Sequence, residues 1–171
     1  NTTGASNTAV GKGALDANTT TDDNTGIGTN ALTDNTTGGL NTSIGSEALA
    51  NNTTADENTA VGSLSLFTNT TGGSNTAVGH DSLRLSTTGA NNSAFGANAL
   101  RADTTGHSNV AVGGSAGDNI TTGDNNIIIG YNIDAASATA TAAAAVVSAQ
   151  LADDWAVKTS GVVADSEYSS K

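Results

Sequence analysis

The pentapeptide Asn7-Thr8-Ala9-Val10-Gly11 decides the fold of this chain, because it returns along the sequence at a constant spacing. Further copies begin at Asn24, Asn41, Asn58 and Asn75, and looser copies begin at Asn92, Asn109 and Asn126. Successive copies start 17 residues apart, so eight repeats account for most of the 171 residues. A constant period of this length indicates a repeat architecture, in which each unit buries its apolar side chains against its neighbours.

Six positions of the repeat keep their character along the chain. The Asn and the Gly of the pentapeptide never vary, and neither does a Thr pair that begins as Thr2-Thr3 and ends as Thr121-Thr122. A fifth position, the Val column, is always large and apolar: Val10, Ile27, Ile44, Val61, Val78, Phe95, Val112 and Ile129. A sixth position, the Leu column, holds Leu15, Leu32, Leu49, Leu66, Leu83 and Leu100 before it changes to Gly117 and Asp134.

The repeat predicts short strands joined by turns, because it is rich in Thr, Asn and Gly and lacks a helical spacing of apolar residues. Thr8–Val10 is predicted to form a strand, Ala14-Leu15 a second strand, and Thr2-Thr3 a third extended piece. Stacked coils of this kind form a mostly β, parallel β-solenoid (β-roll) of eight 17-residue coils, which we place at residues 1–134. In such a stack the invariant Asn can pass hydrogen bonds from coil to coil, and the invariant Gly marks a bend that a Cβ would obstruct.

The apolar content of one coil predicts an oligomer. We expect the Val and Leu columns to fill the interior, where burial contributes about 1.5–3 kcal/mol per side chain. Ordering the backbone costs about 1–2 kcal/mol per residue, so one chain needs a second buried surface. Two columns of small residues, which begin with Ala9 and Ala14, suit close packing between chains. We therefore expect a homotrimer with these small columns at its interface.

The repeat stops at Asp134, and residues 135–171 form a second predicted domain. Residues 135–157 are Ala-rich and contain neither Gly nor Pro, which predicts a short α-helical connector that Gly161 ends. The residues of one face of this helix suit a narrow bundle between subunits: Ala140, Ala144, Val147, Leu151 and Trp155. We expect the rest of the domain to begin a following linker module.

The composition excludes several classes of partner. A net charge of −11 and a pI near 4.1 make nucleic acid an unsuitable partner, because phosphate binding needs a basic face. No apolar run approaches the roughly 18 residues of a membrane span, so we expect no membrane insertion. The chain has no Cys and only five aromatic residues (one Trp, two Tyr, two Phe), which argues against an ordinary globular enzyme.

No catalytic, cofactor-binding or metal-binding residues are predicted, and we expect no cofactor. His80 and His107 belong to different positions of the repeat, and we interpret both as exposed residues of the coils. The acidic turn residues could bind Ca²⁺, but they match no calcium-binding motif and are interpreted as solvated. These residues are Asp22, Asp23, Asp56, Glu57 and Asp124.

Two features resemble bacteriophage tail fibres. The repeat Asn-Thr-Ala-Val-Gly-x-x-Ala-Leu is similar to repeats in such fibres, and more distantly to the head repeats of trimeric autotransporter adhesins. The segment Leu151-Ala-Asp-Asp-Trp-Ala-Val-Lys-Thr-Ser-Gly161, followed by Glu167-Tyr-Ser-Ser-Lys171, resembles an Ala-rich linker module that recurs in phage tail fibres. Together these features cover essentially the whole chain.

The resemblance implies a virion protein that serves attachment to the host. Such fibres are homotrimers, so the expected partners are further copies of this chain, other virion or tail proteins, and a host surface glycan or protein. We expect the chain to be a segment of a longer extracellular fibre, with the receptor-binding tip outside it. Two alternatives remain open at this point: the head of a bacterial trimeric surface adhesin, and an ice-binding β-solenoid that displays Thr ladders.

Overall fold

The structure is a computed structural model that describes residues 3–133. The contacts between residues divide the chain into two units, Asn1–Ala135 and Ala136–Lys171, and the described residues lie in the first. The predicted helical connector, its apolar face with Trp155, and the segment that resembles a linker module all lie outside the described residues.

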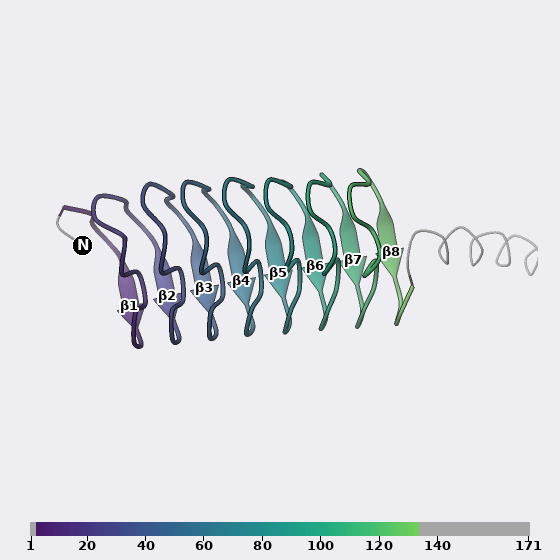
Figure 1. The fold of residues 1–171 in the computed structure, drawn as a ribbon, viewed down its shortest axis with the longest axis horizontal. Coiled ribbons are helices and arrows are strands. Elements are labelled where there is room, and N and C mark those ends of the chain that lie inside the picture. Colours follow the sequence, from purple (N-terminus) through teal and green to yellow (C-terminus); the bar gives the residue numbers. More distant parts are fainter. Residues whose placement is uncertain (1–2, 134–171) are drawn as a thin grey trace, which may run out of the picture. The chain divides into compact units, whose positions relative to one another are not determined.

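The described residues form a parallel β-solenoid, which confirms the predicted fold. Its eight strands stack in sequence order as a single sheet, and each strand pairs in parallel with the next (Figure 1). Within each pair, residue n faces residue n+17, as Thr59 faces Thr76. The strands are β1 (Thr8–Val10), β2 (Thr25–Ile27), β3 (Thr42–Ile44), β4 (Thr59–Val61), β5 (Thr76–Val78), β6 (Ser93–Phe95), β7 (Val110–Val112) and β8 (Ile127–Ile129).

Each coil contributes one strand, where the sequence predicted two or three extended pieces. The strand at Thr8–Val10 is confirmed, whereas Ala14-Leu15 and its equivalents lie in turns. The leucines of this turn have a left-handed backbone, with φ between 48° and 54°. A strand requires a negative φ, so a left-handed Leu ends any extended segment there. The turn instead directs the Leu side chain into the interior.

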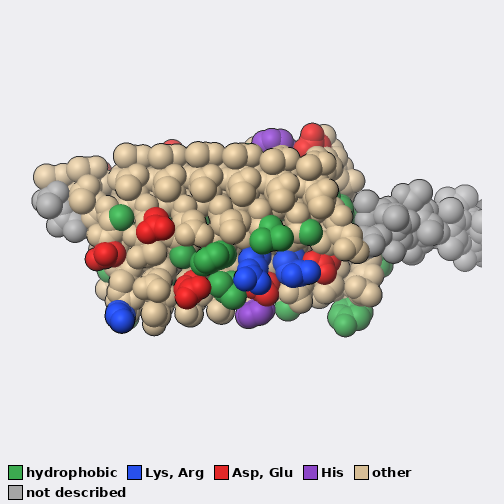
Figure 2. Space-filling view, in the orientation of Figure 1, with side chains coloured by type: hydrophobic (Ala, Val, Ile, Leu, Met, Phe, Trp, Pro, Cys, Tyr) green, Lys and Arg blue, Asp and Glu red, His purple; other side chains and the backbone are tan. Residues whose placement is uncertain are grey.

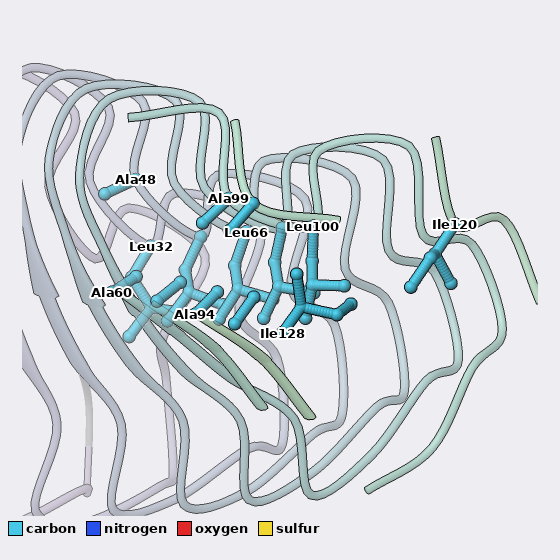
Figure 3. Packing of buried hydrophobic residues seen from close by; sticks show 14 of the residues in the cluster. Leu32, Ala48, Ala60, Leu66, Ala94, Ala99, Leu100, Ile120 and Ile128 are labelled. Atoms are coloured by element: carbon cyan, nitrogen blue, oxygen red, sulfur yellow. The ribbon is translucent and has the colours of Figure 1, made fainter. Parts of the chain in front are cut away.

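The interior of the solenoid consists of a row of leucines facing a row of small residues. Five members of the Leu column, from Leu32 to Leu100, are fully buried. The middle residues of the strands face them, as Ala60 and Ala94 face the row of Leu32, Leu66 and Leu100 in Figure 3. Ile120 and Ile128 belong to the same apolar cluster, toward the C-terminal end of the described solenoid.

The predicted positions of the Val column and the small columns were wrong. Ala60, Ala77 and Ala94 are fully buried, and so are most small residues just before each Leu, such as Ala31 and Ser65. The Val column instead faces outward, and every one of its side chains is half-buried or exposed. Side chains alternate along a strand, so the small middle residue points inward and both of its neighbours point outward.

The width of the coil explains why the small residues lie inside. A Cβ added to Gly26 in the middle of β2 would lie only 3.1 Å from Cγ of Leu15 and from the carbonyl oxygen of Ala31. The Leu row therefore fills the interior almost completely, and the opposite strand has room for Gly, Ala or Ser. A Val at the same position would overfill it.

The invariant Gly after each strand is required by two separate features. Its φ lies between 128° and 144°, a region that L residues rarely adopt. A Cβ on Gly62 would also lie 2.5 Å from the carbonyl oxygen of Gly79 in the next coil. The predicted bend at which a Cβ would be obstructed is therefore confirmed, and the obstruction comes from the backbone of the adjacent coil.

Gly62→Ala is expected to destabilise the solenoid by at least about 2 kcal/mol, because it combines a disfavoured φ with a contact against rigid backbone. Gly39→Ala is the matched control, because its φ is ordinary and its added Cβ would lie 3.5 Å from the nearest atom. Urea unfolding followed by circular dichroism measures both free energies. Equal stability of the two variants would contradict the assigned role of Gly62.

Candidate functional site

The outward side of the sheet is an uncharged surface that runs the length of the described solenoid. We call it the outer face and define it by the Val column together with the column of strand-initial residues. That second column is Thr8, Thr25, Thr42, Thr59, Thr76, Ser93, Val110 and Ile127. Neither column contains a charged residue, and nearly all members are β-branched, which suits a flat pleated surface.

The outer face exposes several large apolar side chains. Val10 is 56% exposed, Phe95 42% and Ile129 68%. Rows of exposed aliphatic side chains about 4.8 Å apart form one continuous patch. An apolar patch of this extent on a soluble protein marks an interaction surface. The sequence analysis had assigned the Val column to the interior.

A polar core lies beside the apolar one, and its first element is the ladder of invariant Asn residues. Asn41 Oδ1 accepts a hydrogen bond of 2.9 Å from the backbone N–H of Asn58, and Asn58 Oδ1 accepts one of 3.0 Å from Asn75. Asn75 Nδ2 donates to the carbonyl of Gly89, in the turn before the next invariant Asn, at 2.8 Å. This first Asn ladder repeats in every coil, as the sequence predicted.

A second ladder, of buried Asn residues whose hydrogen bonds the sequence did not predict, precedes the Thr pair. Asn35, Asn52 and Asn69 each donate from Nδ2 to Oδ1 of the residue one coil earlier, and their first member is Asn18. All four side chains are fully buried. The column then changes to Ser86, Asp103 and Ile120. The sequence repeats Asn-Thr-Thr five times at the 17-residue spacing, from Asn1 to Asn69, but nothing in this pattern shows that the Asn side chains are buried.

The two residues of the invariant Thr pair have different roles. From Thr36 to Thr104, the first Thr donates its hydroxyl to the carbonyl of the first Thr of the next coil, at 2.9–3.0 Å. The second Thr, from Thr20 to Thr122, is exposed in every described coil. One Thr of each pair therefore links adjacent coils, and the other meets solvent.

The pKa of Asp103 is raised above the ordinary value for Asp. This residue is fully buried in the column of the second ladder. Burial raises the pKa of its carboxyl group, which outweighs the opposing effect of the hydrogen bond that Oδ1 accepts from the Gly106 N–H at 2.8 Å. Nearby Asp124 also raises this pKa, whereas His107 and Asn109 lower it.

The candidate residues named from sequence do not converge on a site. His80 is exposed and lies 3.5 Å from the Asp81 carboxylate, and His107 is exposed with its Nδ1 accepting the Ala90 N–H at 3.1 Å. Several turn acids accept backbone N–H bonds from the preceding coil, as Asp56 does from Gly39 at 2.7 Å. Within residues 3–133, no three His, Asp or Glu side chains gather closely enough to hold a metal ion.

The charged side chains of the described solenoid are sparse and mostly acidic, and two of the basic ones face a carboxylate. Arg84 lies 3.6 Å from Asp81, and Arg101 lies 3.0 Å from Asp118. Figure 2 shows the basic side chains on one face next to acidic and hydrophobic ones, surrounded by backbone and uncharged polar side chains. The described residues also include no helix long and apolar enough to cross a membrane.

Comparison of the chain with known proteins found no matching family model, no similar characterised protein and no similar solved structure.

Asn75→Ala is expected to destabilise the protein by roughly 2–4 kcal/mol, because it leaves the buried Asn92 N–H without its acceptor and removes a donor from the Gly89 carbonyl. Asn51→Ala is the control, because its half-buried side chain lies outside both ladders. Chemical unfolding measures the two changes. A loss at Asn75 no larger than the loss at Asn51 would contradict the role of the first ladder.

Asp103→Asn is expected to stabilise the protein at neutral pH. The folded state raises the pKa of Asp103, so it binds the proton more tightly than the unfolded chain does. The protonated Asp103 carboxyl group therefore contributes its full stabilisation below the ordinary pKa of Asp. This contribution is lost as the pH rises through the raised pKa of the folded state. Unfolding free energies measured across acidic and neutral pH should show this decline in the wild type, and the variant should lack it.

Proposed function

We propose that this chain is a structural segment of a phage tail fibre, a trimeric solenoid shaft that serves attachment to the host. The observation that carries the proposal is the outer face, which is uncharged and whose Val column places a large apolar side chain in every described coil. The solenoid can bury this face against further copies of itself, because every coil presents a large apolar residue of the Val column at the same position of its strand. The number of three copies and the phage setting rest on the resemblance of the repeat and of residues 151–171.

The rest of the described surface is mostly polar, which favours an elongated shaft over a compact assembly that packs through several faces. Within residues 3–133, the Val column forms an apolar strip along the sheet, while the second Thr of each pair and the acidic turns remain suited to water. Three copies that pack through one strip each form an elongated bundle with a solvated exterior. In that arrangement the chain acts as a stiff spacer, and several fibres on one particle raise the avidity of attachment.

The proposal is tested by a charge placed on the outer face. Val61 is half-buried in the middle of the Val column, so Val61→Asp is expected to leave the coil interior intact and to break the trimer, because a buried carboxylate without a partner is costly. Thr71→Asp is the matched control, because it adds the same charge to an exposed Thr outside the sheet.

Light scattering after size-exclusion chromatography gives the readout. The wild type and Thr71→Asp should have a mass of about 50 kDa, three times 16.6 kDa, and Val61→Asp should lose this mass together with thermal stability. A wild-type mass of 16.6 kDa would contradict the trimer. A trimer unaffected by Val61→Asp would contradict the outer face as its interface.

A bacterial trimeric surface adhesin is the second candidate, because the same outer face would serve its trimer equally well. The two functions differ in the setting of the protein. Detection of the chain in purified phage particles supports the fibre, whereas an outer-membrane anchor in the same polypeptide supports the adhesin.

A further inference from the structure

The second Asn ladder changes at Ser86, where two buried oxygens have no hydrogen-bond partner within the protein. These atoms are Asn69 Oδ1 and Ser86 Oγ, and both residues are fully buried. In the two preceding coils, the Oδ1 atom accepts a bond of 2.9–3.0 Å from the amide of the following coil. Ser has no amide, so Asn69 is the first member of the ladder without this donor. Buried polar atoms are rarely left unpaired, because the cost is about 1–3 kcal/mol.

The amide that Ser86 replaces has two tasks in the other coils. Asn52 illustrates both, because its Nδ2 donates to Asn35 Oδ1 at 3.0 Å and to the carbonyl of Ala55 at 3.0 Å. One NH₂ group therefore joins the preceding coil to the turn of its own coil. The equivalent acceptors around Ser86 are Asn69 Oδ1 and the carbonyl of Gly89.

The Ser86 hydroxyl takes the place of the amide oxygen, not that of the amide nitrogen. A Cβ added to Gly72 would lie 2.7 Å from Asn69 Oδ1, and a Cβ added to the equivalent Gly89 would lie 3.0 Å from Ser86 Oγ. The two oxygens thus occupy similar positions relative to their turns. The Ser side chain ends one atom earlier than that of Asn, so it does not extend to the position of Nδ2.

We propose that one water molecule binds beside Ser86 at the position that Nδ2 occupies in the other coils. Its two O–H groups donate to Asn69 Oδ1 and to the Gly89 carbonyl, and its oxygen accepts the Ser86 hydroxyl proton. Water matches the donor pattern of the NH₂ group, and three hydrogen bonds are typical of buried water. Ser86 and this water together substitute for an Asn side chain, so the second ladder continues by one further coil.

High-resolution crystal structures of the wild type and of Ser86→Asn test this assignment. The wild type should show a buried water about 2.8 Å from both Asn69 Oδ1 and the Gly89 carbonyl. In Ser86→Asn the new amide should make these two contacts and displace the water. Because an ordered water is no longer immobilised, the unfolding equilibrium constant should fall by up to about thirtyfold.

The variant Ser86→Val distinguishes the effect of filling the space beside Ser86 from the effect of supplying hydrogen-bond donors there. Val is larger than Ser but donates no hydrogen bond, so it should expel the water and destabilise the protein where Asn stabilises it. Three crystallographic results for the wild type would overturn the proposal: no density at this position, a cation coordinated by oxygens, or an Asn69 side chain turned to a partner within the protein. Stabilisation by Val equal to that by Asn would overturn it as well.

Discussion

The amide oxygen of one Asn accepts the backbone N–H of the Asn that stands 17 residues later, and the solenoid depends on this contact. Asn24, Asn41 and Asn58 show it with distances of 2.9–3.0 Å, in positions that water does not reach. Because the side chain of one coil bonds the backbone of the next, each coil fixes the register of its neighbour. The constant 17-residue period brings an Asn into position for this contact in every coil.

The narrow interior determines which side chains are left to face outward. The Leu column fills the space inside each coil, so the middle residue of the strand must be small. Alternation along the strand then places both of its neighbours outside. The interior therefore has no room for the Val column. This column forms a second apolar layer on the outer face, with the same spacing as the first.

The 17-residue period was sufficient to predict the solenoid, the strand at Thr8–Val10, the first Asn ladder and the bend at each Gly. Which side of the strand points into the interior could not be predicted, because a three-residue strand gives too short a pattern to distinguish its two sides. Burial preference suggested that Val lies inside and Ala outside, but the width of the coil reverses this order. The left-handed Leu was also unpredictable, since this conformation is disfavoured for Leu and occurs here because the side chain must reach the interior.

The change in the second ladder gives the solenoid an uneven resistance to tension. A pull along its axis loads the interfaces between coils in series, so the whole yields where one interface is weakest. Between Asn18 and Asn69 each interface has a direct amide bond in the second ladder, in addition to the first ladder and the sheet. The column beyond Asn69 contributes no direct bond between Ser86, Asp103 and Ile120. With the proposed water linking Asn69 to the coil of Ser86, stretching should therefore open the coils after Ser86 before it separates those that precede it.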